Sequence, residues 1–175
     1  MFDSRKQFIP PDLGKMPPGP ELATVLAGIA VDELSGYDQV VVLRAHQRMA
    51  SHYAAHAYAD MAAISATLYD SEDDHQLADE AAAAEIRVAL CLTRRAADAE
   101  LGLALDLQRR LPGVWDLLAG GEIDQRWART IVDGTRHLSP AAARQVVGRL
   151  LARAPRLTTG QLAARVRRLS IESDP

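Results

Sequence analysis

The chain has 175 residues, of which 48% are apolar, and a net charge of −3. It is long enough to bury a stable core unaided, and its single cysteine, Cys91, excludes a disulfide framework and a cysteine zinc cluster. No apolar run reaches the roughly 20 residues of a membrane span and no signal peptide is recognisable, so we expect a cytoplasmic protein without membrane contact or cofactor.

The charges are unevenly distributed along the chain. Residues 1–85 contain 14 acidic and five basic residues, whereas residues 86–175 contain nine acidic and 15 basic residues. Between Gly134 and Ile171 there are eight arginines and no carboxylate. Such a segment suits a polyanion such as DNA, and it equally suits an acidic partner, including the chain's own first half.

Helix-forming residues dominate the composition, which favours an all-α bundle of seven or eight helices. Five of the nine prolines lie in the first 20 residues, so residues 1–19 are expected to form a disordered leader. A single helical domain is expected over residues 20–170, beginning with a short helix at Glu21, and residues 171–175 are expected to form a tail.

The clearest helix of the sequence is also the longest. Ser35 and Asp38 have the spacing of a capping box, and a periodic run then predicts a helix over about 37–69, near 48 Å long. A helix of this length needs partners along it, either later helices or a second copy, and a homodimer is therefore one expected partnership. The expected apolar face consists of Val42, Ala45, Met49, Tyr53, Ala57, Met61, Ile64 and Leu68.

The same helix carries the one tempting metal-ligand pattern. His52, His56 and Asp60 are spaced by four residues and would project from one side, where a second helix could complete a divalent-metal site. The simpler interpretation, which we favour, is that the histidines pack and hydrogen-bond at the edge of an alanine-rich face.

Residues 85–107 have the rhythm of a helix-turn-helix. The helix after the acidic loop 70–75 is expected to bury Leu77, Ala81, Ala84, Val88 and Leu92. Thr93 then caps a helix that opens with Arg94 and Arg95. Arg87 and Glu100 stand where the DNA-reading motif prefers small and apolar residues, and an alanine-rich helical hairpin gives the same pattern.

Residues 109–133 predict a tight corner between helices. Pro112 ends the preceding helix, Gly120 or Gly121 provides the left-handed residue of a helix end, and Asp124 caps the next helix. Trp115 and Trp127 are expected to be wedges in the core and not residues that stack on a cofactor.

Two further helices are predicted after Ser139-Pro140 and after Thr158, which forms a capping box with Gln161. Their arginines lie off the apolar faces and could contact phosphate, or else form a solvated face or pair with the acidic loop. The candidate nucleic-acid contacts are Arg94, Arg95, Arg144, Arg149, Arg153, Arg165, Arg167 and Arg168.

Two motifs resemble those of a known family. One is L-P-x4-L-L-x-x-G-x-I, running from Leu111 to Ile123, and the other is E-I-x-x-A-L-x-L-[ST]-x-x-x-A, running from Glu85 to Ala97. With Ala128 and Ile131 downstream, the chain over roughly 20–170 resembles an actinobacterial family catalogued as domain of unknown function number 222, the thirteen-E-twelve repeat family.

In that family a C-terminal HNH endonuclease domain usually follows the helical region, and many members are tied to mobile or repeated elements. The resemblance therefore implies a role beside duplex DNA, but it supplies no catalytic residues. This chain contains no asparagine, which an HNH centre typically requires. We expect a non-catalytic, DNA-contacting helical domain. The alternatives are a helical interaction or dimerisation module and a metal-dependent enzyme built on the two histidines.

Overall fold

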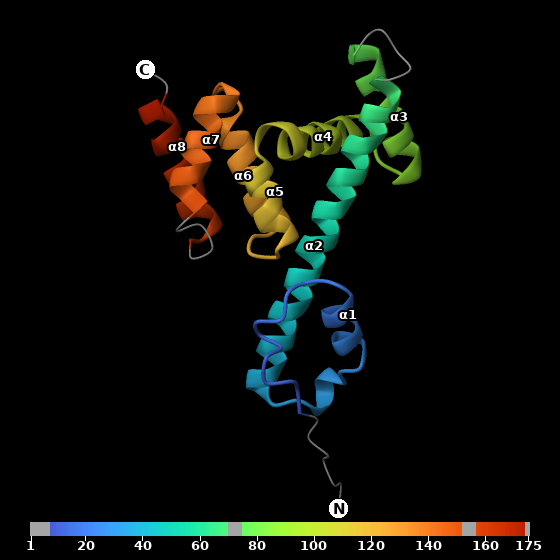
Figure 1. Ribbon diagram of the computed structural model, residues 1–175, viewed down its shortest axis with the longest axis vertical. Helices are drawn as coiled ribbons and strands as arrows, with labels where there is room; N and C mark the ends of the chain where they lie inside the picture. Colours follow the sequence, from blue (N-terminus) through green and yellow to red (C-terminus); the bar gives the residue numbers. More distant parts are fainter. Residues whose placement is uncertain (1–7, 70–74, 152–156, 174–175) are drawn as a thin grey trace, which may run out of the picture.

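The computed structural model describes residues 8–69, 75–151 and 157–173. Within these ranges the chain is all-α, as predicted, with eight α-helices and no strand (Figure 1). The helices are α1 (Pro20–Ala27), α2 (Gly36–Tyr69), α3 (His75–Ala89), α4 (Arg94–Leu105), α5 (Pro112–Ala119), α6 (Gln125–Thr135), α7 (Pro140–Leu151) and α8 (Thr159–Ser173). A short 3-10 turn, η1 (Val31–Glu33), precedes α2, and a π-helical turn, η2 (Asp106–Arg110), follows α4. None of the helices in the described ranges is both long and apolar enough to cross a membrane.

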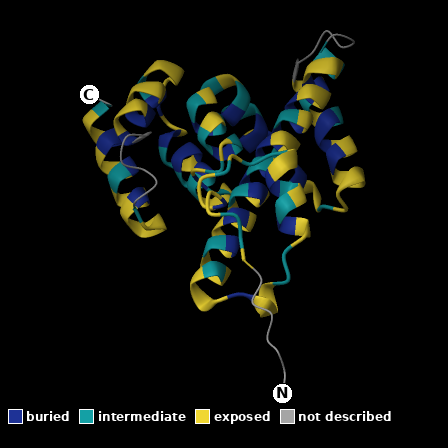
Figure 2. Ribbon diagram, turned by 60° about the horizontal axis from the view of Figure 1, so that its bottom comes forward, coloured by how far each residue is buried: buried dark blue, intermediate teal, exposed yellow. Residues whose placement is uncertain are grey.

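The long helix α2 connects two separate hydrophobic cores (Figure 1). Its first half packs with α1 and the residues before it in a small core that includes Leu22, Leu26 and Met49. Its second half joins α3 to α8 in the main core, where the buried faces of all these helices turn inward (Figure 2). The 34 residues of α2 therefore serve as the common wall of both cores.

Residues 8–19 differ from the disordered leader expected for 1–19. They form an ordered turn against α2, in which the Leu13 side chain is fully buried. Arg48 of α2 fixes this turn by donating to the carbonyl oxygens of Leu13 at 2.7 Å and Met16 at 3.3 Å. This contact joins residues 35 positions apart in the sequence, so the proline content of residues 8–19 gives no indication of it. Residues 1–7 lie outside the described ranges, and the expected tail begins within α8, which continues to Ser173.

The predicted helix starts are confirmed in the structure. Thr93 accepts a hydrogen bond from the Ala96 amide at 3.2 Å, and Asp124 accepts one from the Trp127 amide at 2.9 Å. Thr158 with Gln161 forms the expected capping box, and Ser139 caps α7. Ser35 accepts from the Asp38 amide as expected, but the Asp38 carboxylate accepts from the Ser35 hydroxyl in place of its backbone N–H. These caps involve residues three positions apart, so they depend on local sequence alone.

The apolar faces predicted for α2 and α3 are partly wrong. On α2, Tyr53 is 60% exposed and Ile64 is 37% exposed, while Ala54, Ala55 and Tyr58 are buried in their place. The buried face shifts around the helix because α2 passes from one core to the other. On α3, Leu77 and Val88 are exposed and the buried face is Ala78, Ala82, Ala83 and Ile86. The small alanine side chains let α3 lie close to α2 and α4. Close approach of the helices therefore decides which side of α3 is buried, and the larger size of Leu77 and Val88 does not.

The corner predicted at 109–133 is confirmed, and its left-handed residue is Gly121, with φ of 69°. A Cβ on Gly121 would lie 2.8 Å from the Cβ of Arg48, because the turn rests directly on the α2 backbone. Both tryptophans are partly buried against the main core, and the Trp115 indole donates to the Ala55 carbonyl at 2.8 Å. The residues of this corner therefore hold α5 and α6 against α2.

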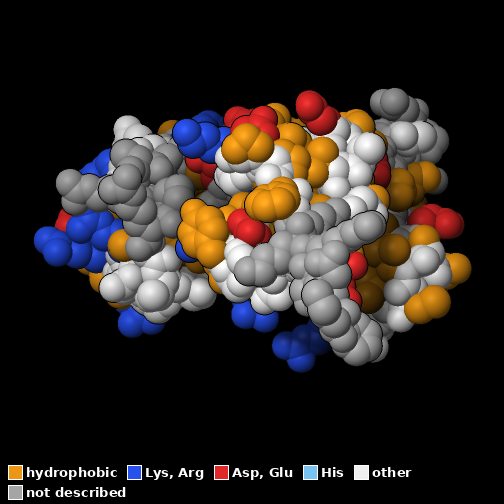
Figure 3. All heavy atoms as spheres, turned by 90° about the horizontal axis from the view of Figure 1, so that it is seen from below, with side chains coloured by type: hydrophobic (Ala, Val, Ile, Leu, Met, Phe, Trp, Pro, Cys, Tyr) orange, Lys and Arg blue, Asp and Glu red, His pale blue; other side chains and the backbone are white. Residues whose placement is uncertain are grey.

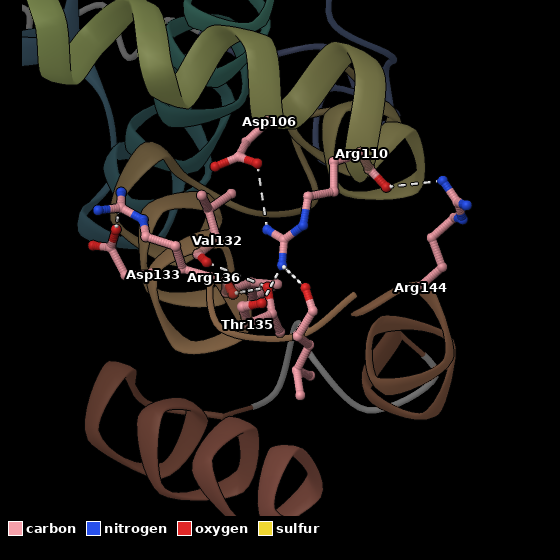
Figure 4. Close-up of polar contacts among 9 residues, drawn as sticks. Asp106, Arg110, Val132, Asp133, Thr135, Arg136 and Arg144 are labelled. Atoms are coloured by element: carbon pink, nitrogen blue, oxygen red, sulfur yellow. Dashed lines mark hydrogen bonds and ion pairs between the residues drawn. The ribbon is translucent and has the colours of Figure 1, made fainter. Parts of the chain in front are cut away.

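The π-helical turn η2 places Arg110 at the centre of the α4–α6–α7 junction (Figure 4). Its guanidinium donates to the carbonyl oxygens of Thr135 and Leu138 at the end of α6, and it pairs with Asp106 at 3.3 Å. Arg144 of α7 donates to the backbone oxygen of Arg110 at 3.5 Å. Carbonyls at a helix end lack intrahelical donors, so Arg110 supplies a donor for the Leu138 carbonyl and a second donor for the Thr135 carbonyl, which also accepts from the Leu138 amide at 3.0 Å.

Candidate nucleic-acid interface

The end of the molecule formed by α7 and α8 carries the densest positive charge of the described residues. Five arginines, at 144, 149, 165, 167 and 168, lie on these two helices, and their only carboxylate among the described residues is Glu172. The apolar residues Leu162, Val166 and Leu169 face α6 and are buried, which turns the arginine side of α8 outward. In Figure 3 basic atoms gather at this end, at the left of the view.

Glu172 forms ion pairs with two of these arginines. Arg149 of α7 reaches it at 3.0 Å and Arg168 of α8 reaches it at 3.1 Å. Hydrogen bonds from Arg168 and Arg149 hold the pKa of Glu172 below its usual value. One carboxylate shared by two exposed arginines leaves the group with a positive net charge, so both guanidiniums keep donors for a further anion.

The remaining arginines of this end differ in their surroundings. Arg144 is exposed and makes the contact to the η2 backbone described above. Arg167 is exposed beside a pocket between α6 and α8, which Asp133, His137 and Ser170 also line, so one carboxylate of α6 lies near this arginine. Arg165 is half-buried, and neither it nor Arg167 forms an ion pair with a described residue. Arg153, also predicted as a contact, lies outside the described residues.

Arg94 and Arg95 do not join this surface. They are exposed at the start of α4, on the side of the molecule where α3 lies, with α7 and α8 at the other side (Figure 1). Arg94 lines a pocket between α3 and α4 together with Arg87, Glu80 and Asp98, so its surroundings are of mixed charge. The turn before α4 contains Cys91 in the left-handed region, with φ of 54°. The seven predicted contacts that the structure describes therefore divide into two separate groups.

The histidines of α2 act as packing residues in the structure. The Nδ1 atom of His52 donates to the Ala119 carbonyl of α5 at 2.8 Å, and its ring lies edge-on to that of His56, with 4.4 Å between centroids. The His56 ring is in turn edge-on to Trp115. Among the described residues no group of three histidine, cysteine, aspartate or glutamate side chains could hold a metal ion.

A partly buried polar cluster that the sequence did not reveal joins α2, α4 and α6. Glu100 accepts a hydrogen bond from the Tyr58 hydroxyl at 3.1 Å and an ion pair from Arg129 at 2.7 Å. Burial, and then the nearby Glu100 carboxylate, raise the pKa of Tyr58 to about 12. The three residues come from helices far apart in the sequence, so no local spacing could have identified them.

We predict that Tyr58 ionises only near pH 12, about two units above a free tyrosine, whose pKa is about 10. Because the folded-state pKa of Tyr58 is raised, the protonated hydroxyl stabilises the folded protein fully below the unfolded-state pKa of about 10. This contribution is lost as pH rises through the folded-state pKa of about 12. Phenolate absorbance during an alkaline titration measures this. A matched titration of the Tyr58→Phe variant should lack the highest step, and an unchanged titration would contradict the assignment.

A second polar cluster lies where α2, α3 and η2 meet. Asp79 accepts hydrogen bonds from Ser65 at 2.8 Å and from the Tyr69 hydroxyl at 2.7 Å. Arg109 lies over the Tyr69 ring, 4.9 Å from its centroid, and also donates to the Tyr69 hydroxyl. This cluster, like the first, links separate helices through paired polar groups, and both serve to fix the relative positions of the helices.

Residues 43–175 match the family model of Domain of unknown function (DUF222). The chain belongs to the DUF222 family. The matched region begins within α2 and contains every helix of the main core, whereas α1 and the ordered turn before it precede the match. No curated protein and no solved structure matches the chain significantly.

The motifs that suggested DUF222 are packing residues in the structure. Leu111 and Leu118 are buried in the main core, Ile123 is 5% exposed, and Gly121 lies against α2. In the upstream motif, Ile86 and Ala97 bring α3 and α4 into the same core. These motif residues thus define the corner and the α3–α4 turn in the structure.

Proposed function

We propose that this DUF222 chain is a non-catalytic helical domain that contacts duplex DNA through the arginines of α7 and α8. The proposal extends to the setting that the resemblance implies, in which the domain positions an HNH endonuclease on DNA in a mobile or repeated element. The observation that carries it is the excess of arginines at one end of the molecule, with Glu172 as their only described carboxylate.

The physical basis is sequence-independent electrostatics. Arginine forks match phosphate oxygens, and each phosphate neutralised releases counterions, so affinity falls as salt rises. No aromatic side chain lies on α7 or α8, so stacking on single-stranded bases is not part of the proposal. Arg94 and Arg95 form a separate and weaker candidate because Glu80 and Asp98 lie beside Arg94.

The test is the affinity for a duplex oligonucleotide, measured by fluorescence anisotropy over a series of salt concentrations. We expect Arg165→Glu with Arg167→Glu to abolish most binding and to reduce the slope of log K against log salt by about two. Neither residue pairs with a described carboxylate, so the change removes donors without breaking a known ion pair.

A matched control reverses two exposed arginines outside α7 and α8, Arg44 and Arg87, which changes the net charge equally. We expect that control to bind almost as the unchanged protein does. If both variants lose DNA affinity equally, the effect is one of net charge and not of the arginines of α7 and α8. If neither variant loses DNA affinity, DNA contact through these arginines is contradicted. An Arg94→Glu, Arg95→Glu variant then measures the share of the start of α4.

A further inference from the structure

One side of α2 is left uncovered along most of its length. Its exposed residues recur at alternating steps of three and four, the spacing of a coiled-coil contact line. We call this line the α2 stripe, and it consists of Leu43, His46, Ala50, Tyr53, Ala57, Asp60 and Ile64, all of which are exposed.

The composition of the α2 stripe is unusual for a solvated surface. Leu43 is 67% exposed and Tyr53 is 60% exposed, and the alanines at 50 and 57 leave room for a helix to approach closely. The stripe contains no arginine or lysine, which makes it unsuited to a phosphate backbone. Its apolar character matches the surface of a helix that packs against another helix.

Read from either end, the stripe presents the same order of residue types. A large apolar residue, an ionisable residue and an alanine lead to Tyr53 at the centre. In an antiparallel pair with its two-fold axis at Tyr53, Leu43 of one copy faces Ile64 of the other, and Ala50 faces Ala57. His46 then faces Asp60, so the one acidic residue meets the one basic side chain of the stripe. The Nδ1 atom of His46 donates to the Val42 carbonyl at 3.2 Å, so Nε2 is the ring nitrogen that remains for a partner, and it donates to a carboxylate when the ring is protonated.

We propose that α2 pairs antiparallel with α2 of a second copy through the α2 stripe. An unrelated partner would need no such internal symmetry, whereas a two-fold dimer requires a surface that complements itself. Only in this register does each large apolar residue face a large one, each alanine face an alanine, and Asp60 face His46. The pairing uses neither α7 nor α8, so it stands or falls independently of DNA contact.

Disulfide trapping tests the register directly. In a Cys91→Ser background, Tyr53→Cys places two cysteines at the two-fold axis, and we expect mild oxidation to convert most of the protein to a covalent dimer. Leu43→Cys is the matched control, because in this register two copies of residue 43 lie about 30 Å apart along the helix axis. A parallel pair would cross-link both variants, and a monomer would cross-link neither; either outcome overturns the proposal.

A charge exchange tests the same pair without cysteines. Molar mass by light scattering should show a dimer, and either His46→Asp or Asp60→His should raise the dimer dissociation constant about tenfold, since each dimer contains the pair twice. The double exchange should restore the dimer. Within one chain residues 46 and 60 lie four turns apart, so recovery cannot arise inside a monomer. Failure of the double variant to recover, or single variants that behave as the unchanged protein, would overturn the register.

Discussion

Replacing Gly121 by alanine should lower the free energy of unfolding by about 3 kcal/mol, because the added methyl group meets both a left-handed backbone conformation and the backbone of α2. The residue has φ of 69°, where an L side chain is strained by about 1 kcal/mol or more. The added Cβ would also lie 2.8 Å from the Arg48 Cβ and 2.9 Å from its Cα. The second contact is to helix backbone, so α2 and the corner would have to separate.

Gly120 provides the matched control for this prediction. Its φ is −74°, and the nearest neighbour of a Cβ there would be the Asp116 oxygen at 3.3 Å, with the next atoms at ordinary van der Waals distances of 3.6 and 3.8 Å. We therefore expect Gly120→Ala to change stability by less than about 1 kcal/mol. Urea unfolding followed by circular dichroism compares the two, and a thermal midpoint lowered by roughly 6–12 °C in Gly121→Ala alone would agree. Similar losses in both variants would show that the turn does not depend on the left-handed residue.

The second large effect is expected at Arg110, whose side chain is only 13% exposed. Arg110→Met preserves much of the apolar stem but removes the arginine donor from the Leu138 carbonyl and the Asp106 carboxylate, while the Thr135 carbonyl keeps only the Leu138 amide. Removing one partner of a largely buried ion pair costs about 3 kcal/mol, because the remaining charge is desolvated and unpaired. The end of α6 should lose its protection from amide hydrogen exchange first.

Arg136 is the control for Arg110. It pairs with Asp133 in the same region at 3.0 Å, but its side chain is 69% exposed, so Arg136→Met should change stability by about 0.5 kcal/mol or less. A second variant separates the causes of the Arg110 effect. Adding Asp106→Ala to Arg110→Met removes the orphaned carboxylate and should recover part of the loss. An Arg110 variant as stable as the Arg136 variant would mean that the junction in Figure 4 does not depend on the guanidinium.

The buried faces show where sequence reasoning reached its limit. The face of α8 can be predicted because Leu162, Val166 and Leu169 are large apolar residues at helical spacing with only alanines and arginines between them, which leaves one choice. In α3 alanines occur on every side, so the periodic pattern gives no unique answer, and the larger Leu77 and Val88 were assigned to the core although they are exposed. In α2 the apolar pattern predicts one continuous buried face, whereas the helix packs into two cores on different sides.

The candidate sites divide in the same way. Arginines concentrated in one segment could be recognised from the sequence, and the structure does place those of α7 and α8 at one end of the molecule. That Arg94 and Arg95 lie elsewhere depends on the path of the chain through α4 to α6. The cluster of Tyr58, Glu100 and Arg129 spans more than 70 positions, and nothing near any of the three announces the others.

The sequence by itself determined that this chain is helical, where its helices begin, and where it turns sharply. Those properties depend on hydrogen bonds and backbone conformations within about one helical turn, such as the Thr93 and Asp124 caps. Tertiary structure alone decided which face of α2 stays uncovered, that residues 8–19 are held by Arg48, and which arginines share a surface. The reason is that these depend on packing between segments distant in the chain, where alanine-rich helices offer several nearly equivalent faces and only the assembled core selects one.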